Sequence, residues 1–274
     1  MDATVKQLNL TKNRESLLKI WETAFPQDTD FAPLFLETAA PFAECFAVLV
    51  DNVPVSAAYF LRADLHINNT CLQARYVYAV GTLPQYRKQG FAANVLQKAA
   101  ESIKADLFFL YPASEALRSY YTRLGYRNIL TQERICIPDV QPTDNPKVTS
   151  APFDAKRYSI ERSEHLKGTT NAYAVFSENL LQILLQSTTI LYLQNATALI
   201  AQNNDSVVVL ELLCAPQHIH SALQEIRTVF SSRTVEVRVP GQEAGGMVLP
   251  ITETAIKHLK NTQKAPFLGT FFDV

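Results

Sequence analysis

Apolar and polar positions along the first half of the chain predict an ordered series of strands and helices. Residues 76–80 form a short apolar run typical of a buried strand, whereas residues 91–103 place their apolar side chains on one face at helical spacing. The expected strands are residues 5–10, 45–50, 55–61, 76–80, 106–111 and 127–137, and the expected helices are residues 14–25 and 31–40, residues 91–103 and a short helix that carries residues 120–126. A longer loop is expected around Asn68 and Asn69. The order predicts an α/β (α+β) fold on a mixed sheet.

The composition changes after residue 137. Prolines then recur among Asp, Asn, Thr and Ser, which is typical of a semi-rigid linker, at Pro138, Pro142, Pro146 and Pro152. This places a boundary near residues 145–155 and predicts domains at 1–145 and 152–274. The second half is expected to contain strands at residues 157–162, 189–193, 196–201, 207–213, 235–239 (with one exposed face) and 266–274, and helices at 171–186, 219–230 and 253–260. The similar order indicates a second, degenerate copy of the first fold.

A basic turn lies between the strand at 76–80 and the helix that begins at Phe91. Its sequence is Tyr-Arg-Lys-Gln-Gly-Phe-Ala, residues 86–92. The first backbone N–H groups of a helix have no internal partners and point outward, so they favour an anionic ligand. Gly90 and Ala92 add little bulk there, and Arg87 and Lys88 add positive charge. The corresponding residues 214–220 contain neither glycine nor arginine, and their proline lacks a donor, so the second copy is not expected to bind a pyrophosphate.

The first half resembles the GCN5-related N-acetyltransferase (GNAT) superfamily. Residues 87–92 match the family's pyrophosphate motif Arg/Gln-x-x-Gly-x-Gly/Ala, and Tyr121 matches the tyrosine that precedes its Leu-Gly-Phe/Tyr ending. Residues 79–81 (Ala-Val-Gly), 114–115 (Ser-Glu) and 121–126 resemble tandem-GNAT acetyltransferases of the Eis type, whose third domain is missing here. The resemblance implies two tandem GNAT-like domains, the second degenerate, with a sheet that splays at the strand before the turn.

The same resemblance implies an acyltransferase that uses acetyl-CoA as cosubstrate and transfers the acetyl group directly to a primary amine. The coenzyme-binding residues would be Ala79, Val80, Arg87, Lys88, Gln89, Gly90, Phe91, Ala92 and Ser114. The backbone N–H near Val80 would stabilise the charge that develops on the acetyl oxygen. Ser114 either contacts the coenzyme or caps the following helix. Tyr121 would protonate the departing thiolate, since a phenol with a pKa near 10 can supply a proton to a thiolate whose thiol has a pKa near 8.5.

The base that deprotonates the amine is not evident. The strand before the turn carries Arg75, Tyr76 and Tyr78, whereas many relatives have a glutamate there. Resemblance to the Eis type makes the carboxylate of the last residue, Val274, a hypothesis. Asp64 and His66 share a strand face, but an exposed hairpin pair is the favoured interpretation. His218 and His220 have no third ligand nearby, so no metal is expected.

Charge and composition limit the classes of partner. Among 274 residues the net charge is −1 and the pI is about 6.5, which gives no electrostatic reason to expect nucleic acid or membrane binding. Four scattered cysteines, no signal peptide and no membrane-length apolar run indicate a cytoplasmic protein whose partner is a small-molecule or peptide amine. Two alternatives stay open: a non-catalytic acetyl-CoA sensor, and a tandem-GNAT aminoacyltransferase that uses aminoacyl-tRNA.

Overall fold

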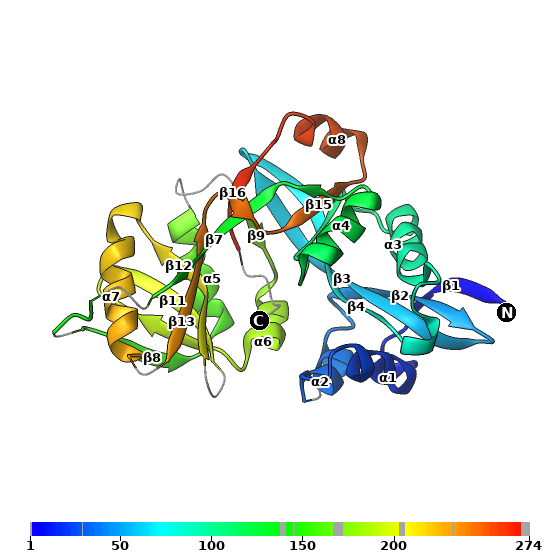
Figure 1. Ribbon diagram of the computed structural model, residues 1–274, viewed down its shortest axis with the longest axis horizontal. Coiled ribbons are helices and arrows are strands. Elements are labelled where there is room, and N and C mark those ends of the chain that lie inside the picture. The colour runs from blue at the N-terminus through cyan, green and yellow to red at the C-terminus, as the bar shows by residue number, and fades with distance from the viewer. Residues whose placement is uncertain are drawn as a thin grey trace.

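The computed structural model describes residues 2–28, 30–137, 141–144, 146–166, 172–202, 206–231 and 233–269. Two sheet-and-helix halves lie side by side and are joined where strands cross between them (Figure 1). The first half contains β1 (Ala3–Leu8), α1 (Arg14–Ala24), α2 (Phe31–Thr38), β2 (Ala43–Val50), β3 (Val53–Ile67), β4 (Thr70–Thr82), the 3-10 turn η1 (Pro84–Tyr86), α3 (Phe91–Ser102), β5 (Leu107–Leu110), α4 (Glu115–Arg123), β6 (Arg127–Asn128) and β7 (Leu130–Cys136).

The second half follows a similar order. It contains β8 (Thr149–Pro152), α5 (Ala155–Leu166), β9 (Ala172–Val175), α6 (Glu178–Leu185), β10 (Thr189–Tyr192), β11 (Ala196–Gln202), β12 (Ser206–Cys214), the 3-10 turn η2 (Pro216–His218), α7 (Ile219–Val229), β13 (Thr234–Pro240), β14 (Glu243–Ala244), β15 (Met247–Pro250), α8 (Glu253–Leu259) and β16 (Ala265–Leu268). Each half therefore places a long hairpin (β3–β4 or β11–β12) before a helix and a parallel strand.

The first sheet is built on β2, β3 and β4, three antiparallel strands joined by two tight turns. Asp51 and Asn52 in the first turn, and Asn68 and Asn69 in the second, have positive φ angles between 49° and 65°. Two successive left-handed residues match the twist of a hairpin, and Asn and Asp tolerate this conformation well. The expectation of a longer loop around Asn68 is therefore wrong, because the connection is a two-residue turn.

The parallel pairing of β4 with β5 is short. It covers Ala74 to Tyr76 and ends there, whereas β4 continues along β3 as far as Thr82. The register between β3 and β4 also shifts between Ala57 and Tyr59, so Ala79 and Val80 lie at a bulge. The sheet thus opens between β4 and β5, at the strand where the sequence predicted a splay.

Each half contributes a strand to the sheet of the other. β7 follows the first half but pairs antiparallel with β13, and β15 from the second half pairs antiparallel with β5. Arg118 on α4 reinforces this exchange by donating to the carbonyls of Ala244 and Gly245 at 3.1 and 3.2 Å. The domain bounds 1–145 and 152–274 stay a prediction. Because strands are exchanged, the sheet of each half is completed by a strand from the other half.

Two predicted elements of the second half are wrong. Residues 157–162 belong to helix α5, where Tyr158, Arg162 and Leu166 are buried at a spacing of four. Residues 171–186 divide into strand β9 and helix α6, which begins after Ser177, whose hydroxyl accepts from the Leu180 N–H. Over such short stretches of mixed polarity, the apolar positions fit the helical period and the strand period equally well. Contacts with distant residues therefore decide whether the stretch forms a helix or a strand.

Strand β13 also differs from expectation. Its Arg238 was predicted on an exposed face, but the residue is buried, with its guanidinium group against the ring of Tyr111 from the first half. The predicted strand at 266–274 corresponds to β16 for four residues, and residues 270–274 lie outside the described part of the chain.

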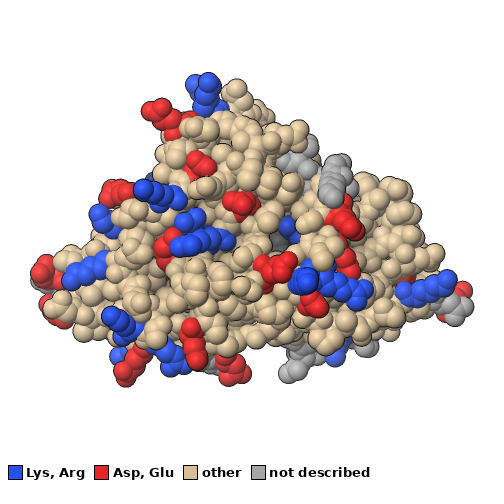
Figure 2. Space-filling model, turned by 180° about the vertical axis from the view of Figure 1, so that it is seen from behind, with Lys and Arg blue, Asp and Glu red and all other residues tan. Residues whose placement is uncertain are grey.

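Charged side chains of both signs are mixed on one face of the molecule. The face in Figure 2 shows Lys and Arg interspersed with Asp and Glu. In the described part of the chain, no helix combines the length and the apolar character needed to span a bilayer.

Candidate functional site

The turn before α3 has the backbone geometry of an anion site. Lys88 and Gly90 both adopt left-handed conformations, with φ of +62° and +80°. Turn residues of this kind aim successive N–H groups toward one point, and the free N–H groups at the start of α3 lie beside them. A Cβ added to Gly90 would meet no atom within 4 Å, and residues 87–90 are exposed. The described segments therefore leave the turn open to a ligand.

Side chains of the turn hold its shape. Arg87 donates from Nε to the Thr82 carbonyl at 3.0 Å, and Gln89 donates from Nε2 to the Gln85 carbonyl at 3.2 Å. Phe91 is buried at the start of α3 with its ring 6.3 Å from that of Tyr86, and Ala92 is half-buried beside it. The structure thus brings residues 87–92 together on one turn, as the motif predicted. Their contact with a coenzyme stays a prediction.

A second strained residue lies at the splay. Ala79 has φ of +48° at the β4 bulge, and the half-buried Val80 follows it. A non-glycine residue in this conformation is disfavoured by about 1–2 kcal/mol. The other described non-glycine residues with positive φ, apart from Lys88, are the Asp and Asn residues of the hairpin turns. Backbone strain outside the hairpins therefore coincides with the two parts of the predicted coenzyme site, and strain of this kind is typical of ligand sites.

Helix α4 carries the predicted proton donor. Ser114 caps this helix, since its hydroxyl accepts from the Leu117 N–H at 3.3 Å; a coenzyme contact of Ser114 stays a prediction. Tyr121 is buried, and its ring makes edge contacts with Tyr120 and Tyr126 at centroid distances of 5.3 and 5.5 Å. Burial raises the pKa of both neighbouring phenols. The role of Tyr121 stays a prediction, and Val274 lies outside the described residues.

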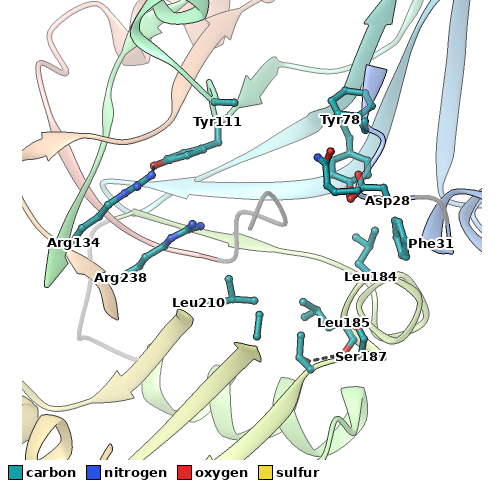
Figure 3. A pocket seen from close by; sticks show the side chains of 15 residues that line it. Asp28, Phe31, Tyr78, Tyr111, Arg134, Leu184, Leu185, Ser187, Leu210 and Arg238 are labelled. Atoms are coloured by element: carbon teal, nitrogen blue, oxygen red, sulfur yellow. Dashed lines mark hydrogen bonds between the residues drawn. The ribbon is translucent and has the colours of Figure 1, made fainter. Parts of the chain in front are cut away.

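A cavity of about 500 Å³ lies where the two halves meet (Figure 3). It reaches the splay, because Tyr78 of β4 and Tyr111, just after β5, form part of its wall. Its other described lining residues are Phe25, Gln27, Asp28, Phe31, Ala113, Arg134, Leu184, Leu185, Ser187, Thr188, Ala201, Leu210 and Arg238. The volume and the mixture of apolar and polar groups suit a small organic molecule.

The charged groups of this cavity were not identified from the sequence. Asp28 lies beside Tyr78, with Arg134 and Arg238 across the cavity (Figure 3). Burial raises the pKa of the Asp28 carboxyl. Asp28 comes from the α1–α2 connection, Arg134 from the crossing strand β7 and Arg238 from β13, so no local motif unites them.

Other candidate residues lie elsewhere. His66 stacks on Tyr173 with ring centroids 4.4 Å apart, and burial lowers the pKa of its imidazole. Asp64 lines a different groove, and Arg75 there donates from Nε to Glu44 at 3.0 Å. Across the described residues no group of three or more His, Cys, Asp and Glu side chains could hold a metal ion.

The corresponding turn of the second half differs in geometry. η2 leads directly into α7, with Ile219 in the right-handed helical region. The described residues between β12 and α7 include none with a positive φ angle. The turn therefore lacks the left-handed residues that shape the first-half site.

The mixed sheet splays beside an open turn that could bind an anion at the start of α3. This arrangement is typical of α/β proteins with the acetyltransferase fold. Residues 5–129 match the model of the Acetyltransferase (GNAT) domain family. A probable N-acyltransferase of unknown function from Enterococcus faecalis V583 superposes with a TM-score of 0.72 and 13% identity, covering 93% of this chain and 74% of the other. Eis1 from Mycobacterium abscessus superposes with a TM-score of 0.62 and 9% identity, and the match covers 91% of this chain and 74% of Eis1.

A tandem GNAT protein from the clavulanic acid biosynthesis pathway covers 92% of this chain and 99% of its own length, with a TM-score of 0.57 and 10% identity. The predicted resemblance to GNAT proteins and the predicted mixed α/β fold are confirmed, and the division into two tandem domains, the second degenerate, stays a prediction. A curated relative, glutamate–tRNA ligase from Neisseria meningitidis, is 26% identical over 141 residues, 46% of this chain. The match spans only 29% of that enzyme.

Proposed function

We propose that this protein is an acetyl-CoA-dependent N-acetyltransferase that acetylates a primary amine directly. One observation carries the proposal: the strained residues Lys88 and Ala79 fall on the open turn and on the splay, the two places where a GNAT domain would hold the diphosphate and the pantetheine arm. Acetyl-CoA would supply an activated thioester. The turn would bind its diphosphate through main-chain N–H groups, with Arg87 and Lys88 adding positive charge.

The cavity supports an acceptor site that meets the coenzyme at the splay. Tyr78 lies in β4 just before the bulge and Tyr111 immediately follows β5, and both line the cavity, so an acceptor there would reach the position of the acetyl group. As the new C–N bond forms and the C–S bond breaks, the amine must lose a proton and the thiolate must gain one. Tyr121 is the proposed donor. Asp28 is the proposed acceptor, because partial burial raises the pKa of its carboxyl and makes the carboxylate a stronger base.

The Val274 carboxylate stays a second candidate for the base. A chain extended by several residues beyond Val274 displaces that carboxylate. Undiminished turnover of the extended protein would reject the hypothesis and leave Asp28, whereas lost turnover with intact acetyl-CoA binding would favour Val274.

Thermal unfolding with acetyl-CoA is the first test. A ligand at a hundredfold excess over its Kd, bound only by the folded state, stabilises that state by about 2.7 kcal/mol. A shift with acetyl-CoA but no thiol release from any amine would favour the sensor. Transfer from aminoacyl-tRNA would favour the aminoacyltransferase, a class for which the net charge of −1 gives little electrostatic support.

Replacement of Tyr121 by Phe tests the chemistry. We expect Tyr121→Phe to lower the rate of thiol release at saturating acetyl-CoA by about 100-fold or more, since it removes a positioned proton donor. Tyr120→Phe is the matched control, because it removes the hydroxyl of the adjacent tyrosine on the same helix. Equal rates in wild type and Tyr121→Phe would exclude Tyr121 as the acid.

A further inference from the structure

Helix α4 carries the proposed proton donor but has little hydrophobic anchoring of its own. Of its residues Glu115–Arg123, Tyr121 alone is buried, and Leu117 is 40% exposed. A helix of nine residues is not stable by itself in water, so contacts with the rest of the chain must hold it. The contacts that fix α4 therefore also fix the position of the Tyr121 hydroxyl.

Arg118 provides polar contacts that reach beyond α4. Its Nη1 donates to the side-chain oxygen of Asn128 at 2.7 Å and to the Gly245 carbonyl at 3.2 Å, and its Nη2 donates to the Ala244 carbonyl at 3.1 Å. Its Nε donates to Glu115 within the helix at 3.0 Å. The side chain is only 13% exposed, so water competes little for these bonds. Because the guanidinium group is planar and rigid, contacts from all three nitrogens fix its orientation.

The two carbonyls that accept from this guanidinium group belong to the β14–β15 segment, residues 243–250 of the second half. Ala244 pairs with Thr131 of β7, and the Gly245 N–H donates to the Leu130 carbonyl at 3.1 Å. A Cβ added to Gly245 would lie 3.1 Å from that carbonyl oxygen, so the backbone there packs closely against the chain leading into β7. The acceptors are therefore held in place independently of α4.

The other end of α4 meets the same segment. β15 lies beside α4 (Figure 1), and a Cβ added to Gly125, just after the helix, would lie 3.3 Å from Cδ1 of Leu249 in β15. The Tyr126 N–H donates back to the Tyr121 carbonyl at 3.1 Å, so the turn at Gly125 closes onto the last turn of the helix. The β14–β15 segment thus contacts α4 on both sides of Tyr121, at Arg118 and at Gly125.

We propose that Arg118 is a positioning residue, through which the second half holds α4 so that the Tyr121 hydroxyl faces the departing thiolate. The proposal rests on the proposed function and deepens it. As the C–S bond breaks and its electron pair passes to sulfur, Tyr121 gives its O–H proton to that sulfur, and water later returns a proton to the phenolate. A displacement of about 1 Å can cost a catalytic group about 100-fold in rate. Loss of the Arg118 contacts should therefore slow the reaction without weakening coenzyme binding.

The kinetics of Arg118→Gln test this inference. At saturating acetyl-CoA and amine, kcat for thiol release should fall by about tenfold or more, while the Kd for acetyl-CoA changes by about twofold or less. Arg118→Lys should recover little of the loss, since an ammonium group cannot reproduce the planar fork that spans two carbonyls. Arg123→Gln is the control, because it removes the same charge at an exposed position of the same helix. Wild-type kcat in Arg118→Gln would overturn the inference.

A double mutant separates positioning from a general structural effect. If Arg118 acts through Tyr121, Arg118→Gln should change kcat by about twofold or less in a Tyr121→Phe background, where no hydroxyl is left to position. Circular dichroism at the assay temperature checks that each protein is folded. The same loss of kcat in both backgrounds would mean that Arg118 supports the site by another route, and the inference would fail.

Asn128→Ala is a second variant, because it removes one acceptor of the Arg118 side chain and leaves α4 unchanged. It should lower kcat by about threefold or more, and only where Tyr121 is present. If Arg118→Gln does not fold, wild-type kcat in Asn128→Ala overturns the inference.

The kinetic results also distinguish this inference from the proposed function. A wild type that releases no thiol with any amine would contradict the proposed function, and the positioning role with it. Wild-type kcat in Tyr121→Phe would overturn the positioning role and leave the acetyltransferase proposal standing. An active wild type with an equally active Arg118→Gln would contradict the positioning role alone.

Discussion

At the residue scale, Gly90 links backbone conformation to the coenzyme binding that we propose. It has φ of +80°, and Gly125 after α4 has φ of +92°. We expect Gly90→Ala and Gly125→Ala each to lose about 1 kcal/mol of unfolding free energy, because alanine is strained in this region. Gly90→Ala alone should also weaken acetyl-CoA binding, since its methyl group would occupy the open approach to the turn. Calorimetric titration of both variants checks this, and equal affinities would show that ligand does not approach Gly90.

Asp28 gives a second residue-scale prediction, on pH. Burial raises the pKa of its carboxyl in the folded protein above the ordinary value of 3.8. As pH rises above 3.8, the unfolded chain loses this proton first, so the ionised group increasingly disfavours the folded state. Between pH 4 and 7.5, the stability of the wild type should therefore fall relative to Asp28→Asn.

Denaturant titrations of both proteins at several pH values measure this difference. Asp144→Asn removes the same charge at an exposed position and should give a smaller change with pH. A wild type that gains stability over Asp28→Asn as pH rises would mean that the Asp28 carboxylate has a stabilising partner in the folded protein.

At the scale of elements, a buried ion pair joins α5 to β12. Arg162 donates to Glu211 at 2.8 and 3.2 Å, and their side chains are 8% and 0% exposed. Arg162 also donates to the carbonyls of Ala174 in β9 and Leu268 in β16. Four elements therefore meet at one guanidinium group, which fixes α5 against the sheet.

Glu211→Gln should lower the free energy of unfolding by about 3–5 kcal/mol, because it leaves the Arg162 charge buried without its counterion. Glu161→Gln is the matched control: Glu161 pairs with Arg157 at 2.9 Å on the same helix, but the two side chains are 27% and 56% exposed. Urea denaturation should show a much smaller effect for the control. Similar losses in both variants would imply that burial does not determine the strength of these pairs.

The elements also show what the sequence could and could not predict. Residues 91–103 and 219–230 repeat apolar positions at one clear period over three turns, and both helices form where expected. The stretch 157–162 is too short to distinguish the helical period from the strand period. Its buried polar residue, Arg162, forms its ion pair with a residue of the distant strand β12. Local patterns thus specify amphipathic elements well, and elements anchored by distant polar contacts poorly.

The turn at residues 87–92 and the cavity differ in the same way. Residues 87–92 are contiguous, so a motif in the sequence was enough to predict them as a coenzyme site. Asp28, Tyr78, Arg134 and Arg238 come from four separate segments, and Arg134 meets Arg238 only because β7 crosses into the second sheet. The cavity, where we propose that the acceptor binds, is therefore a product of the topology, which a single sequence does not reveal.

At the scale of the whole molecule, the exchanged strands make the two halves depend on each other. β15 covers the edge of β5 over four residue pairs, and β7 pairs with five residues of β13. A chain ending at residue 145 would expose the edge of β5 and leave β7 without its sheet. We therefore expect the fragment 1–145 to be insoluble or unfolded, as judged by circular dichroism, unless the fragment 152–274 is produced with it.

Cooperativity between the halves can be measured in the intact chain, because the only tryptophan, Trp21, is buried in the first half. Its fluorescence reports unfolding of that half, whereas Glu211→Gln destabilises the second. If the exchanged strands couple the halves, Glu211→Gln should lower the midpoint of the Trp21 transition in urea, and that midpoint should coincide with the far-ultraviolet circular dichroism transition. A Trp21 midpoint that stays at the wild-type value while circular dichroism shows an earlier transition would mean that the first half folds independently. In that case β15 could not be essential to its sheet.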